Sequence, residues 1–274
     1  MRRSLRLFDV LCIGLNAIVG SGIFLLPDDI YREMGVYSPL AFLLCAVGLL
    51  PIALSYATLA GQVEETGGPY VYASRAFGPR AGFLVGWMSY ANALFSFAAV
   101  SAAAAAYALR LFPAVAAVLS PEVVGLGAVV AFSALNYRGA RPGAWAVDAF
   151  TIAKFLVLFL LVAALVPAWQ APAPSGLPHG AAGIGAATYM ALFAAQGFEV
   201  VGVPAGETQN PRRNVPIAVV GSLVLASVLY VIVQGALLGS GIDWSVSSDA
   251  PLADAAVRVL PALGLVVAIG GLVS

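Results

Sequence analysis

The sequence predicts an all-α integral membrane protein, and three observations support this fold class. Hydrophobic residues make up 61% of the 274 positions and charged residues only 9%, whereas a soluble domain averages about 25% charged residues. The apolar residues fall into continuous runs of about 20, the length a helix needs to cross the hydrocarbon core. Glycines interrupt two of these runs near their centres, and these two runs are the first and the sixth along the chain.

The apolar runs predict eight membrane-spanning segments. In order, they cover residues 7–31, 38–61, 81–111, 122–137, 144–167, 181–205, 213–239, and a last segment from about 255. The first is expected to be broken and the sixth to have a possible break. The last run reaches Ser274 before a crossing is finished, so we expect the sequence to stop inside its eighth helix.

The first span contains Gly20-Ser21-Gly22-Ile23-Phe24, which weakens a helix. Each glycine costs roughly 0.5–1 kcal/mol relative to alanine in a helix. If the helix opens there, backbone groups are freed at bilayer depth, which is tolerated only inside protein or beside a cavity. The half-helix that starts near Phe24 would direct its first amides into that cavity, where they suit a carboxylate. Close helix packing through small residues is the alternative explanation.

The sixth span has a similar stretch, Gln196-Gly197-Phe198-Glu199, with further glycines and a proline up to Gly206. An offset of five spans reverses the direction of crossing, as an inverted repeat requires. We therefore predict a first five-helix repeat in residues 1–168 and part of a second in residues 169–274. The alternative is a kinked structural helix at a chance spacing.

The basic residues predict the orientation in the membrane. With the N-terminus inside, nine arginines face the cytoplasm and three face outward. The inner set is Arg2, Arg3, Arg6, Arg75, Arg80, Arg138, Arg141, Arg212 and Arg213, and the outer set is Arg32, Arg110 and Arg258. The sequence therefore predicts a multi-pass protein of the cell membrane with a cytoplasmic N-terminus.

Two ionisable residues are expected within the membrane. Lys154, the only lysine, lies near the middle of the fifth span, where a cation costs about 3 kcal/mol on insertion scales. It is interpreted as a carrier of coupling protons, as a fixed strut on freed carbonyl groups, or as a bystander near a water-filled vestibule. Glu199 is interpreted as a proton sensor, as a partner for a cationic group, or as a hydrated residue near the cytoplasmic end.

Two charged loops are expected at the inner surface. Residues 65–79 contain Gly-Gly-Pro followed by aromatic and basic residues, which suits a short interfacial helix. Residues 206–216 combine Glu207 with Arg212 and Arg213, and we expect Glu–Arg pairs there to latch an inner gate. Exposed pairs are worth only about 0–1 kcal/mol, so they would tune gating rather than stability.

Several chemistries have no support in the sequence. The two cysteines, Cys12 and Cys45, lie in apolar spans and indicate no disulfide framework. No metal-ligand spacing, Walker-type glycine loop or Gly-x-Ser-x-Gly frame is present. We therefore predict no enzyme activity, no metal, no cofactor and no nucleic-acid partner.

Taken together, these segments resemble the amino acid–polyamine–organocation family of amino acid permeases. The matching motifs occur in the family's order over almost the whole chain. They are Gly20-Ser21-Gly22-Ile23-Phe24, Glu65-Thr66-Gly67-Gly68-Pro69-Tyr70, Phe77-Gly78-Pro79, Asn136-Tyr137-Arg138-Gly139, Lys154, Gln196-Gly197-Phe198-Glu199 and Asn210-Pro211-Arg212-Arg213-Asn214-Val215-Pro216.

The resemblance implies a LeuT-type inverted-repeat fold with helices one and six broken around the substrate. The carboxylate of the substrate would bind to the amides at the break in helix one, and its ammonium group would bind to the carbonyls at the break in helix six. Phe193 would cover the substrate as an aromatic cap. Lys154 and Glu199 match positions linked to proton coupling in some members. The implied substrate site consists of Ala17, Gly20, Ser21, Gly22, Ile23, Phe193, Ala194 and Gln196.

The function predicted from the resemblance is secondary transport of amino acids by alternating access, as proton-coupled symport. Exchange, and transport of cationic amino acids or polyamines, are the alternatives within transport. An amino-acid-binding membrane sensor and an inactive fragment are the alternatives outside it, since relatives usually have twelve helices. The expected partners are an amino acid, protons and the lipid bilayer, and a neutral or small apolar amino acid is the preferred substrate.

Overall fold

A computed structural model of the protein describes residues 3–111, 118–137, 140–172, 176–242, 244 and 251–273. Within these ranges the regular elements are helices, and the only extended contact is an isolated parallel bridge between Leu5 and Thr208. Four helices in the described part are long and apolar enough to cross a membrane. The protein therefore has the all-α membrane fold that the sequence predicts.

The first half of the chain forms the helices that correspond to the first five predicted spans. In order, they are α1 (Leu7–Ile18), α2 (Gly22–Leu25), α3 (Pro27–Met34), the 3-10 helix η1 (Gly35–Tyr37), α4 (Pro39–Gln62), α5 (Pro69–Phe77), α6 (Pro79–Leu111), α8 (Pro121–Tyr137), α9 (Ala140–Leu165) and the 3-10 helix η2 (Val166–Ala168).

The second half begins with a helix that gives way to two short 3-10 helices. In order, its elements are α10 (Gly180–Ala195), η3 (Phe198–Gly202), η4 (Ala205–Glu207), α11 (Pro211–Leu238), α12 (Pro251–Val259) and α13 (Pro261–Val273). Most of the described helices start at or just after a proline. Proline suits the first turn of a helix, because an N–H group at that position would have no acceptor within the helix.

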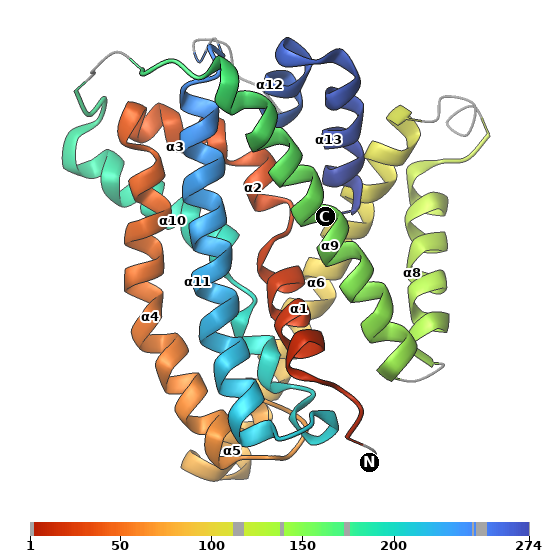
Figure 1. Cartoon of the computed structure of the whole chain (residues 1–274). Helices are drawn as coiled ribbons and strands as arrows, with labels where there is room; N and C mark the ends of the chain where they lie inside the picture. Colours follow the sequence, from red (N-terminus) through yellow and green to blue (C-terminus); the bar gives the residue numbers. More distant parts are fainter. Residues whose placement is uncertain are drawn as a thin grey trace.

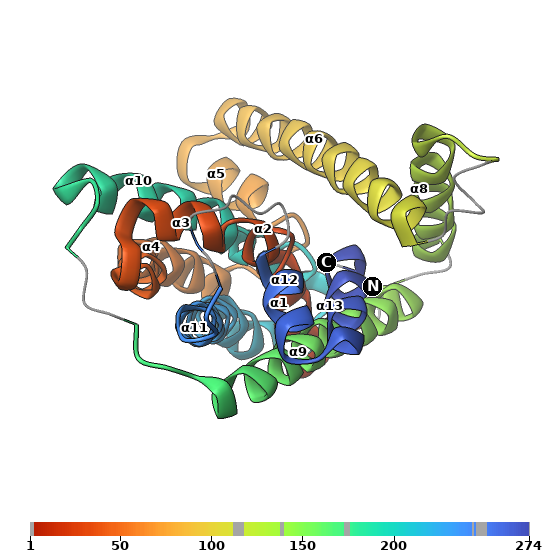
Figure 2. The same ribbon diagram turned by 90° about the horizontal axis from the view of Figure 1, so that it is seen from above.

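The helices form a central bundle with two helices at its side. In the bundle α4 packs along α11, α1 packs against α11 and α9, and α10 packs against α3 and α4 (Figure 1). Outside it, α6 contacts α5 and α8, and the view from above places α6 and α8 beside the bundle (Figure 2). The space between α6 and the bundle is where the functional site lies.

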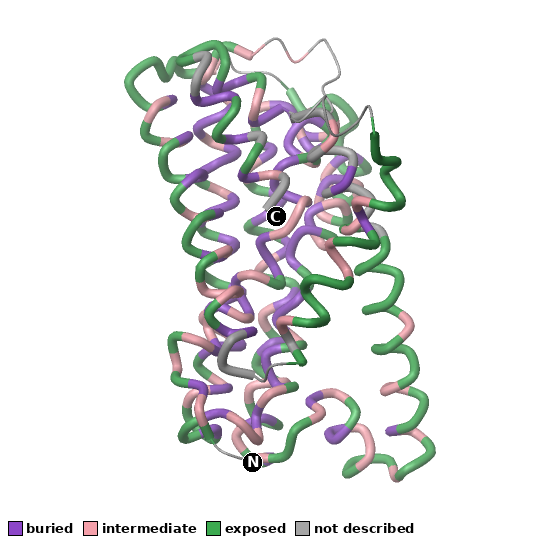
Figure 3. The backbone as a smooth tube through the Cα atoms, turned by 90° about the vertical axis from the view of Figure 1, so that its right-hand side faces the viewer, coloured by how far each residue is buried: buried purple, intermediate pink, exposed green. Residues whose placement is uncertain are grey.

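Burial follows the arrangement of the bundle. Buried positions run along the inner helices, and exposed positions cover the outer ones (Figure 3). Many exposed side chains are large and apolar, for example Leu43, Val47 and Leu54 on α4. An apolar exterior of this kind suits contact with lipid rather than with water.

Close packing of α1 on α11 depends on a glycine. A Cβ atom added at Gly14 would lie 2.6 Å from Ser222 Oγ and 2.7 Å from Val201 Cγ2. Small residues that let two backbones approach closely are typical of helix contacts in membranes. Gly14 therefore fixes α1 against α11 just before the point where α1 ends.

The last predicted span differs from the structure in its shape. The sequence predicts one helix from about residue 255, but the structure has α12 and α13 separated at Leu260. Pro261 has no N–H to donate, and its ring clashes with a preceding helical carbonyl, which favours a break in the helix at this point. Pro51 and Pro216, in contrast, lie inside α4 and α11 without ending them.

Candidate functional site

The first element of the site is the end of α1. This helix stops at Ile18, and Val19 leaves the helical region with φ −77° and ψ 79°. The amide of Gly20 then bonds to the carbonyl of Ile18 at 2.8 Å in a tight turn, and helix resumes at Gly22. Of the residues between the two helices, Gly20 and Ser21 belong to the stretch that the sequence singles out, and Val19 lies directly before it.

The second element is the end of α10. This helix stops at Ala195, Gln196 is extended, and Gly197 has φ 123°, a value that side chains disfavour. A Cβ atom at Gly197 would lie 2.6 Å from both the carbonyl carbon and the oxygen of Ala17. The backbone of Gly197 is therefore in direct contact with the last turn of α1, and only glycine fits this contact.

Tyr230 of α11 joins the two helix ends. Its hydroxyl lies 2.8 Å from the carbonyl oxygen of Ile18 and 3.0 Å from that of Ala194, within donating distance of both. Its side chain is buried. The hydroxyl of Tyr230 thus contacts one carbonyl group from the last turn of α1 and one from the last turn of α10. Carbonyl groups in the last turn of a helix receive no hydrogen bond from within that helix.

Sequence reasoning did not identify Tyr230, although a signal was present. Ser222, Ser227, Tyr230 and Gln234 are buried polar residues in the part of α11 after Pro216, which is otherwise apolar. Gln234, one turn after Tyr230, donates through Nε2 to the carbonyl of Pro27 at 3.1 Å and to Ser38 Oγ at 2.9 Å. Polar side chains repeated within an apolar span indicate contacts to neighbouring backbone.

Lys154 of α9 lies behind the interruption of α1. The side chain is buried, and Nζ donates a hydrogen bond to the carbonyl of Val19 at 2.9 Å. One turn earlier, Thr151 Oγ1 lies 3.3 Å from the carbonyl of Cys12. Lys154 thus contacts the first non-helical residue of the break, which is the contact that the strut interpretation requires.

Glu199 stabilises the bend after α10. Its Oε2 accepts a hydrogen bond from the amide of Gly197 at 2.9 Å, and the residue is partly buried. The carboxylate therefore satisfies a backbone amide at the very residue whose φ is positive. Glu199 also lines the cavity described next.

Both helix ends open onto one cavity of about 520 Å³, between the bundle and α6. This volume lies within the usual range of small-molecule sites. Seven of the predicted substrate-site residues line it, together with Glu199. These seven are Ala17, Gly20, Ser21, Gly22, Phe193, Ala194 and Gln196.

Ile23 departs from the prediction. Its side chain is fully buried in the hydrophobic core and does not line the cavity. The helix has resumed by Gly22, so the side chain of the next residue rotates to another face. Gly22 itself faces Ala194 closely, since a Cβ there would lie 2.8 Å from the Cβ of Ala194.

The cavity has a wall that sequence reasoning did not find. Polar residues of α6 and α1 complete the lining opposite and beside the helix ends. They are Asn16, Ser89, Asn92 and Ser96. Among the described residues, no group of three His, Cys, Asp or Glu side chains is arranged to hold a metal ion.

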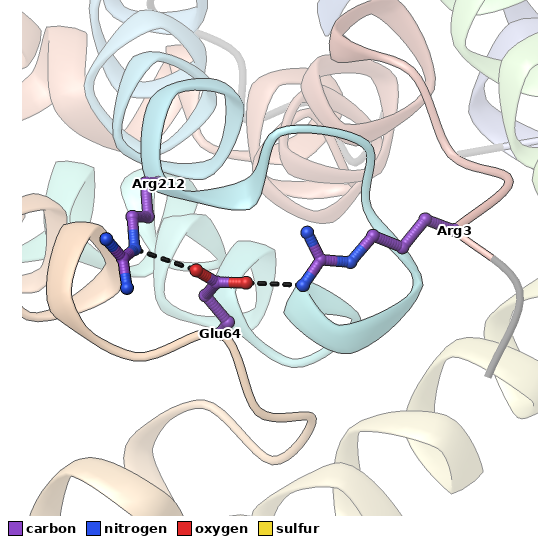
Figure 4. Close-up of polar contacts among 3 residues, drawn as sticks. All are labelled: Arg3, Glu64 and Arg212. Carbon is purple, nitrogen blue, oxygen red and sulfur yellow. Dashed lines mark hydrogen bonds and ion pairs between the residues drawn. The ribbon is translucent and has the colours of Figure 1, made fainter.

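The end of the bundle next to the N-terminus carries a charged cluster around Glu64, which lies shortly after α4. Its carboxylate pairs with the guanidinium of Arg3 and, at 2.7 Å, with that of Arg212 at the start of α11 (Figure 4). The hydrogen bond from Arg3 is the largest influence on Glu64, and it lowers the pKa of the carboxyl group. The predicted Glu–Arg pairing therefore involves Glu64, from another loop, as the partner of Arg212.

Backbone contacts hold the N-terminal arm in the same place. The amide of Leu5 donates to the carbonyl of Glu207 at 3.0 Å, and the amide of Gln209 donates to the carbonyl of Leu5 at 2.7 Å. Leu5 is buried. The arm before α1 is thus bonded to the loop before α11, and Glu64 ties both to the end of α4.

Comparisons with known proteins identify the family of the chain. A family model described as amino acid permease matches residues 5–273. Cationic amino acid transporter 4 of Homo sapiens is 30% identical over 277 residues, covering 93% of this chain and 44% of the relative. The branched-chain amino acid permease BcaP of Bacillus subtilis is 29% identical over 275 residues, covering 90% and 58%.

A third relative is the b(0,+)-type amino acid transporter 1 of Mus musculus, 27% identical over 250 residues, with 85% of this chain and 50% of the relative covered. The chain spans about half the length of the curated relatives it matches. Members of the matched family are transporters and not enzymes. The chain belongs to the amino acid permease family.

Proposed function

We propose that the protein carries out secondary active transport of amino acids by alternating access around the interrupted helices α1 and α10. One observation carries this proposal: both helix ends open onto the same cavity of about 520 Å³. The first amides of α2 and the last carbonyls of α1 and α10 have no helical partners, because the helices begin and end there. The cavity therefore offers donors and acceptors to one ligand.

These groups suit an amino acid zwitterion. The start of a helix favours an anion, so the amides around Gly22 would receive the carboxylate. The hydroxyl of Tyr230 already lies 3.0 Å from the carbonyl of Ala194, so the neighbouring carbonyls of Phe193 and Gln196 would accept the ammonium. The open space around Gly20, where an added Cβ would meet nothing within 4 Å, leaves room for the ligand backbone.

Coupling to protons is part of the proposal. The support is a single buried lysine, Lys154, whose Nζ contacts the carbonyl of Val19 at the interruption. Loss or gain of a proton there would change how firmly α1 is held to α9. Glu199, on the bend after α10, is the second proposed proton-responsive group.

The proposed membrane arrangement follows from the charged end of the bundle. The N-terminus, α5 and the start of α11 lie at the same end (Figure 1), and the arginines Arg3, Arg75 and Arg212 lie on these segments. We place this end in the cytoplasm and the protein in the cell membrane. In this arrangement residues 1–168 form the first repeat and residues 169–274 part of the second.

Cationic amino acids are the second candidate class of substrate. Glu199 is the only lining residue of the described cavity with a carboxylate, and no lysine or arginine lines it. The human relative is named a cationic amino acid transporter. Competition by lysine and arginine against neutral amino acids separates the two classes.

Transport is tested with the whole protein reconstituted in proteoliposomes. We expect uptake of a labelled amino acid that increases when the outside is made more acidic than the inside. Equal uptake with and without the gradient, together with rapid exchange against internal amino acid, would support exchange and contradict symport. Saturable binding without any flux would support a membrane sensor instead.

A further inference from the structure

The helix α6 presents an unusual face to the cavity. Gly86, Ser89, Asn92, Ala93, Ser96 and Val100 line the cavity from this helix. Their spacing of three and four residues places them on one side of the helix. The other sides carry large apolar residues such as Phe83, Trp87 and Phe95, whose side chains are between 59% and 74% exposed. The polar side of α6 therefore faces the site, and the apolar side faces outward.

Asn92 has the largest number of hydrogen-bonding groups among the polar side chains on this face. It is exposed near the middle of α6, and no hydrogen bond of its carboxamide is present among the described residues. Ser101 of the same helix satisfies its hydroxyl locally, on the carbonyl of Phe97 at 2.7 Å. A carboxamide offers two donors and an acceptor, so a ligand that displaces water from the cavity must replace the hydrogen bonds of Asn92 or leave them unmade.

A second unsatisfied group borders the same cavity. Oδ1 of Asn16, on the last turns of α1, is buried and has no hydrogen-bond partner within the described part of the chain. Asn16 and Asn92 both line the cavity. Two carboxamides from different helices thus present hydrogen-bonding groups to one space.

We infer that Asn92, with Ser89, Ser96 and Asn16, selects substrates whose side chain both donates and accepts hydrogen bonds: neutral amino acids with a hydroxyl or carboxamide group. This inference rests on the proposed function. The helix ends would hold the ligand's carboxylate and ammonium, which leaves the α6 wall to contact its side chain. An aliphatic side chain would leave Asn92 unpaired, and such a loss is strongly selective.

A cationic side chain fits this wall less well. The groups on α6 are neutral, and the carboxylate of Glu199 already accepts the amide of Gly197 at 2.9 Å. The inference therefore differs from the small apolar preference that the sequence suggests and from the cationic alternative.

The test measures competition for uptake by the whole protein in proteoliposomes. We expect glutamine, asparagine or serine to inhibit labelled uptake more strongly than leucine, valine or lysine. Asn92→Leu should shift the ratio of KM values between glutamine and leucine toward leucine by roughly tenfold, with little change in kcat for leucine. Ser101→Ala, on the same helix but outside the cavity, should leave the ratio unchanged.

Each outcome decides the inference. A wild-type preference for leucine, valine or lysine would overturn it, as would an unchanged ratio in Asn92→Leu. If Asn92→Leu fails to reach the membrane, the same ratio is measured in Asn92→Ala and judged by the same criterion. Uptake of no amino acid at all would instead overturn the proposed function, on which the inference depends.

Discussion

At the scale of single residues, a few contacts hold the interrupted backbone in place. Gly197 touches the backbone of Ala17, Tyr230 reaches carbonyls of both helix ends, and Lys154 holds the carbonyl of Val19. Each contact satisfies or positions a backbone group that would otherwise be costly at membrane depth. The interruptions are therefore held by specific contacts, and the contribution of each contact can be tested by substituting single residues.

Substitution of Gly197 should be destabilising. Alanine there would adopt φ 123° and would place its Cβ 2.6 Å from Ala17, so we expect Gly197→Ala to cost about 1–3 kcal/mol or more. Gly185→Ala is the matched control, because Gly185 lies within α10 and an added Cβ meets nothing within 4 Å. Thermal unfolding in detergent measures both, and equal melting temperatures for the two variants would contradict this account.

Lys154→Ala should uncouple transport. Removal of the ammonium group leaves the carbonyl of Val19 without this donor, so we expect gradient-driven uptake to fall at least about tenfold. Exchange of labelled for unlabelled amino acid without a gradient reports whether binding survives. Thr151→Val, one turn away, is the control, and full gradient-driven uptake by Lys154→Ala would exclude the coupling role.

At the scale of elements, three segments meet at the end of the bundle that we propose to be cytoplasmic. The N-terminal arm, the residue after α4 and the start of α11 meet at Glu64 (Figure 4). Because α1 follows directly after the arm, any inward opening that tilts α1 must break this cluster. Glu64 is therefore expected to act as a latch, in the role that the sequence assigns to Glu–Arg pairs of the inner loops.

Glu64→Gln should weaken the latch. We expect faster alkylation of Cys12, a buried thiol on α1, by about two- to fivefold, since exposed ion pairs contribute modestly. The measurement uses a Cys45→Ala background and a reagent supplied to the inner side. Glu65→Gln is the matched control, because Glu65 pairs with Arg75 at 2.7 Å away from the arm. Identical rates for both variants would show that Glu64 is no latch.

The latch should be insensitive to pH near neutrality. The Arg3 guanidinium lowers the pKa of Glu64 from the ordinary value of about 4.3. A carboxyl group with a lowered pKa contributes fully above its ordinary value and loses that contribution as pH falls through the lowered one. The alkylation ratio of Glu64→Gln to wild type should thus stay constant from about pH 5.5 to 8. Convergence of the two rates between pH 8 and 6 would contradict this assignment.

At the scale of the whole molecule, α6 lies beside the bundle (Figure 2), and residues of both line the cavity onto which both helix ends open. The bundle helices α4 and α11 form the support against which α1 and α10 pack. The polar wall of α6 faces the helix ends across the cavity. Under the proposed function, this arrangement would separate the groups that bind the amino acid backbone from those that contact its side chain.

Much of this architecture follows from the sequence. Span boundaries agree within a few residues, as for the predicted 38–61 and the observed Pro39–Gln62, because prolines and glycines flank long apolar runs. Tyr230, Asn92 and the Glu64 cluster were not predicted, since their roles depend on which helices lie side by side. The orientation of Ile23 likewise depends on where the helix resumes.

The central claim is that the ends of α1 and α10 together bind one amino acid, and equilibrium binding of labelled amino acid to the purified whole protein tests it most directly. A Cβ atom added at Gly20 meets nothing within 4 Å, so we expect Gly20→Leu to extend into the open space at the interruption, whereas Gly48→Leu adds the same side chain on the exposed face of α4. We expect saturable binding that Gly20→Leu weakens more than about tenfold and Gly48→Leu leaves intact. Equal affinity of wild type and Gly20→Leu, or no binding of any amino acid by the wild type, would contradict the account.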